Sequence, residues 1–493
     1  MKRYFEIALL GAAFFGLSAC TKKSAQPLVP AMPTLPPITT TSAITVDCSQ
    51  QQGNVMRLEQ SNVHSSTSAM PGEKARTWLQ AMNHKTIRTW LALRTIYNQG
   101  YNYNYQGSVR VEPSLDFYST CADSLLVALT AYKPSVASPL PGDGKGTLFQ
   151  NFIKQTLIYY KTKYPKIKYI QAGNEPDYNG ETAAEYYEVY KDYYKAVNAA
   201  NAEMGLAGNN RIMLSNGAFT STTNFSALVS YASQFFALYA ADPDPAKRLD
   251  FFSMNCYTEQ TNPKLFETAK SQIITALSSK GLGARQVFAT EYGLVGGTFI
   301  PAAWTQAQTM TAWAPGQLAK AFYMYEGGVD RVFNWSISHG EILHKSELTD
   351  VANNAYPNPY GYALMFAKEV SDRGTRVKVT STKLSNAGLG INALASAGNG
   401  KGIAILVWNY NYTNYVADQN IEVKINNIPK SLFNDKMNAK IYYVDSKNNN
   451  VYNNPSQTSL KSTTEQAYNY SASLSIPLTL EGNAVALIVL NPQ

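Results

Sequence analysis

Two glutamates each close an apolar segment of strand length, and each is a candidate catalytic residue. Glu175 stands in "AGNEPD", where Pro176 ends the segment, and Glu291 stands in "ATEYG". Cleavage of a glycosidic bond needs two carboxyl groups, one that protonates the leaving oxygen and one that attacks the sugar or activates water. A single glutamate at a strand end is most often a solvated side chain. The pair is therefore informative only if the fold brings the two residues together.

Other segments carry polar or aromatic residues that would suit the same site. Arg88 in "TIRTWL" could point inward and hold a carboxylate ionised. Asn174 precedes Glu175 directly, and "MNCYTE" offers Asn255 and Tyr257, a phenol that could bond to a carboxylate. Trp335 in "FNWSIS" could serve as a platform for a sugar ring. The alternatives are an outward arginine on the wall of the fold, and aromatic residues that only pack.

Alternating strands and helices predict a (β/α)8 barrel over residues 46–368. Helical spacing of apolar residues before the fourth segment supports the alternation. The alternative is a doubly wound sheet, which often has a glycine-rich turn after its first strand, and this sequence has no such turn there. In a barrel the fourth and seventh strands end on opposite sides of the mouth, so Glu175 and Glu291 should face each other. The eight expected strands are 54–60, 85–93, 124–132, 167–173, 211–217, 249–257, 285–291 and 330–337.

The pattern changes after the barrel. Over residues 369–493, short segments that alternate or run apolar are separated by Asn, Gly and Ser, which predicts a β-sandwich accessory domain. The stretch 44–52 is a candidate to pair with this sandwich.

The N-terminus reads as a processing signal. Two basic residues precede an apolar run that ends in "LSAC", which resembles the bacterial lipobox and predicts a lipoprotein signal peptide over residues 1–19 with the lipid on Cys20. Residues 20–45 are rich in Pro, Ser and Thr and read as a tether. We expect a lipid-anchored protein of the bacterial envelope, in the outer membrane because Thr21 rather than Asp follows the cysteine. The alternative is an ordinary signal peptide with a chance cysteine.

Composition excludes several classes of function. The formal charge of +8 comes from 42 basic and 34 acidic residues, and the basic ones are dispersed, so no nucleic-acid partner is expected. The chain has four histidines and neither an HExxH motif nor a G-x-S-x-G elbow, which argues against common zinc peptidases and serine hydrolases. Three further cysteines, Cys48, Cys121 and Cys256, allow one disulfide and lack metal-ligand spacing. No metal or organic cofactor is expected.

The motifs "GNEPD" and "TEYG", at the ends of strands four and seven, resemble clan A of the glycoside hydrolases. A barrel followed by a β-sandwich is most similar to family 39, the family of β-xylosidases and α-L-iduronidases, and families 30 and 51 share much of this layout. Arg88, Tyr257 and Trp335 stand where that clan has its supporting Arg, Tyr and Trp. One position departs from the pattern: Asn255 stands where many clan members have His.

The resemblance implies a retaining mechanism, with Glu291 as nucleophile and Glu175 as acid/base. It further implies that Asn174 bonds to the sugar 2-hydroxyl. Exo action, as in a β-xylosidase, and endo action, as in a glycanase, both remain open. A non-catalytic glycan-binding lipoprotein on a barrel scaffold is the competing class.

Overall fold

A computed structural model of the chain provides the structure, and its segment Thr40–Gln493 forms one unit. The predicted signal peptide, Cys20 and most of the predicted tether lie outside the described residues. The structure describes residues 41–59, 63–64, 73–82, 84–98, 111–131, 140–220, 223–294, 305–335, 357–398, 400–411, 418–457 and 459–493.

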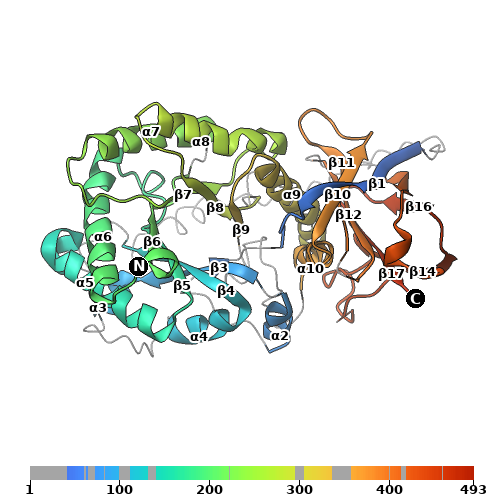
Figure 1. The fold of residues 1–493 in the computed structure, drawn as a ribbon, viewed down its shortest axis with the longest axis horizontal. Helices are drawn as coiled ribbons and strands as arrows, with labels where there is room; N and C mark the ends of the chain where they lie inside the picture. The colour runs from blue at the N-terminus through green and yellow to red at the C-terminus, as the bar shows by residue number, and fades with distance from the viewer. Residues whose placement is uncertain are drawn as a thin grey trace, which may run out of the picture. The chain divides into compact units, whose positions relative to one another are not determined.

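Parallel strands separated by helices form the (β/α)8 barrel (Figure 1). Five of the strands pair in the order β2-β3-β4-β5-β6 and three in the order β7-β8-β9. A bridge between Phe219 and Met254 connects the two groups. In chain order the strands are β2 (Val63–His64), β3 (His84–Ala92), β4 (Ala122–Thr130), β5 (Ile167–Ala172), β6 (Met213–Ser215), β7 (Phe251–Cys256), β8 (Gln286–Tyr292) and β9 (Arg331–Asn334).

Helices lie between successive strands and outside them, as Figure 1 shows for α5 to α8. Helix α6 begins with a capping box, in which Thr182 accepts from the N–H of Glu185 and Glu185 accepts from the N–H of Thr182. The helices of the barrel are α2 (Glu73–Met82), α3 (Leu93–Asn98), α4 (Val111–Cys121), α5 (Gly146–Lys163), α6 (Ala183–Glu203), α7 (Phe225–Ala241), α8 (Ala269–Ser278), α9 (Gln306–Glu326) and α10 (Pro359–Ser371).

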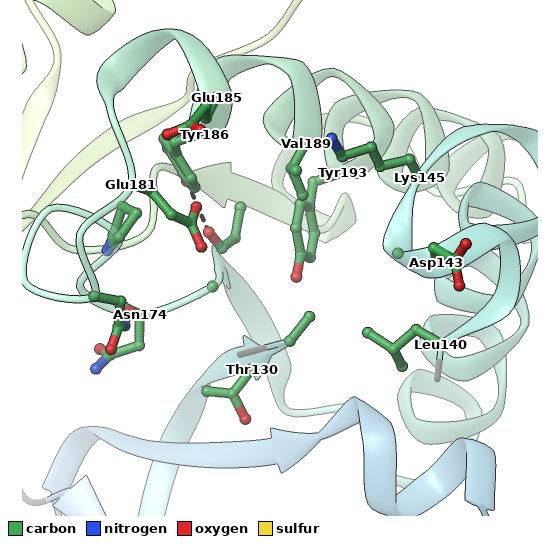
Figure 2. A pocket seen from close by; sticks show the side chains of 16 residues that line it. Thr130, Leu140, Asp143, Lys145, Asn174, Glu181, Glu185, Tyr186, Val189 and Tyr193 are labelled. Carbon is green, nitrogen blue, oxygen red and sulfur yellow. Dashed lines mark hydrogen bonds between the residues drawn. The ribbon is translucent and has the colours of Figure 1, made fainter. Parts of the chain in front are cut away.

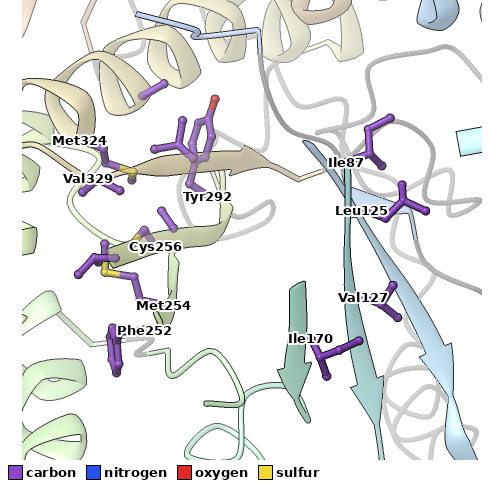
Figure 3. Close-up of a cluster of buried hydrophobic side chains, with 14 of the residues drawn as sticks. Ile87, Leu125, Val127, Ile170, Phe252, Met254, Cys256, Tyr292, Met324 and Val329 are labelled. Atoms are coloured by element: carbon purple, nitrogen blue, oxygen red, sulfur yellow. The ribbon is translucent and has the colours of Figure 1, made fainter. Parts of the chain in front are cut away.

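Alternation along the strands gives the barrel two apolar layers. Every second residue along a strand points outward and belongs to the large cluster that includes the helices. Figure 3 shows Ile87, Val127, Ile170 and Met254 among these residues. The strand residues between them point inward, and a separate interior cluster consists of Leu126, Tyr169, Phe251, Phe288 and Phe333. Arg88 and Gln171 directly follow the outward residues Ile87 and Ile170, so their side chains face the interior.

The C-terminal strands form a nine-stranded sheet in the order β15-β14-β17-β12-β11-β10-β1-β13-β16. Its strands are β1 (Thr41–Asn54), β10 (Thr375–Ser381), β11 (Gly390–Ala397), β12 (Ile403–Tyr410), β13 (Gln419–Asn426), β14 (Lys436–Val444), β15 (Thr464–Asn469), β16 (Ser473–Leu480) and β17 (Val485–Pro492). Its apolar faces enclose a second core, to which Ile44 and Val46 contribute.

Strand β1 corrects the predicted start of the barrel at residue 46. It pairs antiparallel with β10 and parallel with β13, so residues 46–54 belong to the C-terminal sheet, with which the stretch 44–52 was expected to pair. The physical reason is burial: Ile44 and Val46 are fully buried on the sheet, and Asn427 donates a hydrogen bond to Asp47.

Three further segments differ from expectation. In the described part of the predicted first strand, residues 54–59, Asn54 is the last residue of β1 and a turn follows at 58–59, so β2 takes the place of this strand beside β3. Strand β11 reads "GINALASA", and the sequence does not indicate it, because its small residues resemble a loop or a helix as much as a strand. The sequence does not indicate strand β15 either, because it is polar and largely exposed on the edge of the sheet.

Cys48, Cys121 and Cys256 are buried as free thiols, so the described residues contain no disulfide. No helix in the part of the chain that the structure describes is long and apolar enough to cross a membrane.

Candidate active site

Glu175 lies in a tight turn directly after β5. Its backbone has a φ of 50°, a left-handed conformation that is unusual for a residue with a side chain. The N–H of Glu175 donates to the carbonyl of Gly217 at 2.6 Å, and the N–H and amide of Asn179 donate to the carbonyl of Glu175 at 3.0 and 2.8 Å. These three bonds hold a strained backbone conformation of the kind that concentrates at functional sites.

Glu291 lies in β8, with 4% of its surface exposed. Nη1 of Arg88 lies 2.6 Å from its Oε1, and the phenol of Tyr257 donates to its Oε2 at 2.6 Å. Both oxygens of the carboxyl group therefore accept hydrogen bonds, one from a guanidinium and one from a phenol. Burial and the charge of Glu291 raise the pKa of Tyr257 well above its ordinary value, so the phenol remains a donor.

Arg88 is fully buried, and its guanidinium contacts residues at the ends of both β5 and β8. Besides Glu291, it donates from Nη2 to Oδ1 of Asn174 at 2.9 Å and from Nε to Oε1 of Gln171 at 3.1 Å. Gln171 in turn donates to Oδ1 of Asn174 at 3.1 Å. A planar guanidinium can make these contacts together, whereas an ammonium is a single point charge.

Asn255 connects the other carboxyl group to the same site. Its Nδ2 donates to Oε1 of Glu175 at 2.7 Å, and its Oδ1 accepts from the hydroxyl of Thr290 at 3.0 Å. The register between β7 and β8 shifts at this point, so that Asn255 pairs with Glu291 and Thr290 is the extra residue of a bulge. Bulges commonly redirect side chains beside active sites, and here the bulge lets Thr290 fix the orientation of the Asn255 amide.

The pKa of Glu175 is raised to about 8. Burial is the largest cause, and the negative charges of Glu291 and Asp177 add to it, while the Asn255 hydrogen bond and Arg88 lower it. The two carboxyl groups of this site therefore have different surroundings. Glu291 has a cation and a phenol, whereas Glu175 has one amide donor.

Trp335 follows β9, and its backbone N–H donates to the backbone carbonyl of Tyr292 at 2.9 Å. Its ring meets that of Trp90 edge to face, with centroids 6.0 Å apart, and Arg88 lies over the Trp90 ring at 4.9 Å. Trp90 therefore lies against the guanidinium that binds Glu291, and Trp335 packs against Trp90.

A cavity of about 400 Å³ lies beside the turn that carries Glu175, between the ends of β4 and β5 and helix α6. Figure 2 shows Asn174 at its edge and Tyr193 directed into it from α6. Its lining includes neither Glu175 nor Glu291. The cavity thus adjoins the carboxylate pair and is separate from it.

Hydrogen bonds join the side chains of Arg88, Asn174, Tyr257 and Glu291 in one group and those of Glu175 and Asn255 in a second. The two groups meet where Asn174 precedes Glu175 in the chain, and Trp335 lies against Trp90. Gln171, Thr290 and Trp90 were not singled out from the sequence. Gln171 had one signal, a polar residue inside an apolar strand. Within the described ranges, no group of His, Cys, Asp and Glu could hold a metal ion.

Comparisons with known proteins bear on the fold. No family profile and no curated protein sequence matches the chain. Solved structures do match. A glucosidase from Croceicoccus marinus has a TM-score of 0.65 at 14% identity and covers 92% of this chain and 99% of its own. A family 39 (GH39) enzyme from Xanthomonas axonopodis pv. citri has a TM-score of 0.63 at 12% identity, with 92% and 98% covered.

A monomeric β-xylosidase from Caulobacter crescentus has a TM-score of 0.62 at 12% identity, with 92% of this chain and all of that chain covered (100%). The match extends through barrel and sandwich alike, which confirms the fold expected from the sequence: a (β/α)8 barrel followed by a C-terminal β-sandwich, shared with these glycoside hydrolases.

Proposed function

We propose that the protein is a retaining glycoside hydrolase, in which Glu291 is the nucleophile and Glu175 the general acid/base. The observation that carries the proposal is that two neighbouring carboxyl groups have different surroundings. Glu291 accepts from Arg88 and Tyr257, while the pKa of Glu175 is raised to about 8. Two carboxyl groups whose environments differ in this way are the usual signature of an acid and a nucleophile.

In the first step, Glu175 gives its proton to the glycosidic oxygen as the bond from that oxygen to the anomeric carbon breaks. A Glu291 oxygen attacks the anomeric carbon from the opposite face and forms a glycosyl ester. In the second step, the Glu175 carboxylate takes a proton from water, and the water oxygen displaces Glu291. Two inversions at the anomeric carbon give a product of retained configuration.

The surrounding side chains support this division of labour. Arg88 donates to one oxygen of Glu291 and Tyr257 donates to the other, so two fixed donors orient the carboxylate that would attack the sugar. Asn174 is fixed by Arg88 and Gln171 through its oxygen, so its Nδ2 is available for a sugar hydroxyl. Asn255 orients the Glu175 carboxyl without neutralising it.

For the substrate we propose an oligo- or polysaccharide cleaved in the manner of an exo-acting β-xylosidase. The similarity of the motifs to family 39 supports this, as does the fold shared with a β-xylosidase and a glucosidase. An endo-acting glycanase of the same clan is the other outcome of the test.

The test is a screen of the protein, cut after the tether, against aryl xylosides, arabinosides, glucosides and galactosides, together with polysaccharides. We expect release of the aryl alcohol from at least one glycoside, and a rate at least about 1,000-fold lower in Glu291→Ala. Activity on polysaccharide alone would indicate an endo enzyme. Binding without turnover on every glycan, or an unchanged rate in Glu291→Ala, would defeat the hydrolase.

We further propose that the protein is anchored in the bacterial outer membrane through a lipid on Cys20. The "LSAC" sequence and the Pro-, Ser- and Thr-rich residues after it support the proposal. Labelling cells with a radioactive fatty acid should mark the full chain and not its Cys20→Ala variant. Equal labelling of both would contradict the anchor.

A further inference from the structure

Asp177 lies two residues beyond Glu175 in the same turn, and its carboxyl group has an unusual environment. Oδ2 accepts from the N–H of Thr220 at 2.8 Å. Oδ1 is buried and has no hydrogen-bond partner. A buried carboxylate oxygen without a donor is costly, so its presence beside a candidate acid calls for an explanation.

The hydrogen bond from Thr220 to the Asp177 carboxyl group ties the turn to the segment that follows β6. That segment is also held by Glu175, whose N–H donates to Gly217, and it contacts β7, because the N–H of Asn255 donates to Phe219 at 2.8 Å. Asn255 then donates to the Glu175 carboxyl. Asp177, the Thr220 segment, Asn255 and Glu175 therefore form a closed ring of contacts.

The segment fits closely against the turn. A Cβ added to Gly217 would lie 2.7 Å from the carbonyl oxygen of Ala172 and 3.2 Å from Pro176. The backbone therefore has little freedom between Gly217 and Thr220, and a displacement of the Asp177 anchor would be transmitted to both Glu175 and Asn255.

The charged groups around the two carboxyls are few. Glu175 is affected by Glu291, Asp177 and Arg88, and Tyr257 lies near both glutamates. Asp177 and Glu181 both act on the Tyr231 phenol, which donates to the Glu181 carbonyl. Burial raises the pKa of Asp177 to about 7, and the hydrogen bond from the backbone N–H of Thr220 is the largest contribution that opposes the rise. The negative charge of Asp177 is one of the contributions that raise the pKa of Glu175.

We propose that Asp177 is a positioning residue for Glu175: its bonded oxygen fixes the turn and the segment that leads to Asn255, and its charge holds the proton on Glu175. The inference deepens the proposed function and rests on it for the role of that proton. Burial and two neighbouring carboxylates, Glu291 within the reaction and Asp177 outside it, then keep the acid protonated.

The test is the titration of Glu175 itself, followed by NMR of the side-chain carboxyl in protein labelled with ¹³C-glutamate and assigned with Glu175→Gln. Asp177→Asn keeps the shape and an oxygen that can accept from Thr220 but removes the charge. We expect the midpoint of Glu175 to fall by roughly 0.5 to 1 pH unit. The alkaline limb of kcat/KM on an active glycoside should fall by the same amount.

Glu181→Gln is the matched control. It removes a carboxylate that acts on Tyr231, as Asp177 does, but Glu181 is not among the largest contributions to the pKa of Glu175. Its midpoint should stay within about 0.2 pH unit of the wild type. If Asp177→Asn does not fold, Asp177→Ser keeps an oxygen acceptor and also lacks the charge.

A Glu175 midpoint that stays in place or rises in the neutral variants would overturn the inference. The titration needs no substrate, so it separates the two proposals. A shifted midpoint in a protein without turnover would refute the hydrolase alone, and an unshifted midpoint in an active enzyme would refute the role of Asp177 alone.

Discussion

Arg88 and Glu291 form a buried ion pair between the second and seventh strands of the barrel, with 2.6 Å between Nη1 and Oε1 and side chains 0% and 5% exposed. The same guanidinium binds Asn174, the neighbour of Glu175. The Arg88 guanidinium therefore contacts both the proposed nucleophile and the residue next to the proposed acid.

Arg88→Met should destabilise the protein strongly, because it leaves the Glu291 carboxylate buried without its cation. We expect a loss of about 3 to 5 kcal/mol in the free energy of unfolding, measured by urea denaturation. Lys85→Met is the control on the same strand; its bridge to Asp123 is half exposed and should contribute less than about 1 kcal/mol. Equal losses in the two variants would contradict the importance of the buried pair.

Asn255→Ala should move the alkaline limb of activity upward. The Asn255 hydrogen bond lowers the pKa of Glu175, so its loss lets the acid keep its proton beyond pH 8. The shift should be about 0.5 to 1 pH unit, measured as kcat/KM against pH. Thr290→Val removes only the bond that orients the amide and should give a smaller shift in the same direction. A downward shift in Asn255→Ala would contradict this role.

Part of this candidate site could be predicted, because functional residues of a (β/α)8 barrel lie at the C-terminal ends of its strands. Glu175 and Glu291 stand out as polar residues at the ends of apolar segments whose spacing fits strands four and seven, and Arg88 stands out as a charged residue inside the apolar segment of strand two. Thr290 could not be predicted, since its role depends on a bulge that only the register of β7 and β8 reveals. Gln171 binds an arginine 83 positions away in the chain, which no local pattern indicates.

The fold shows the same limit. Strand β1 joins β10 and β13, which lie more than three hundred residues further along the chain. Its apolar residues predict a strand without naming a partner, so the boundary at residue 46 was wrong. The polar edge strand β15 lacks the alternation on which strand prediction depends.

Gly217→Ala should destabilise the protein by about 1 to 3 kcal/mol, because the added methyl group meets backbone and ring atoms that cannot move aside. It should also lower kcat, since the carbonyl of Gly217 anchors Glu175. Gly283→Ala is the control: its new Cβ would meet only the movable end of Arg285, at 3.3 Å. Thermal unfolding and initial rates check both effects, and a fully active, stable Gly217→Ala would contradict the tight fit.

His84 should make the fold sensitive to acid. The imidazole is fully buried, and burial together with the charges of Arg57 and Lys368 lowers its pKa from 6.5 to about 3. The stability contributed by the neutral form is complete above pH 6.5 and is lost as the pH falls toward 3. The slope from one such group is at most about 1.4 kcal/mol per pH unit. Urea unfolding of His84→Gln between pH 4 and 7 should show a flatter dependence than the wild type, and parallel curves would contradict the prediction.

The central claim is that Glu291 forms a covalent bond to the sugar. The most direct measurement uses the 2-deoxy-2-fluoro analogue of the glycoside found in the screen, which slows the second step, followed by intact mass and peptide mapping. The account predicts one added fluoroglycosyl group on the peptide that contains Glu291, and none in Glu291→Ala. An adduct on Glu175, or hydrolysis of the parent glycoside with inverted anomeric configuration, would contradict it.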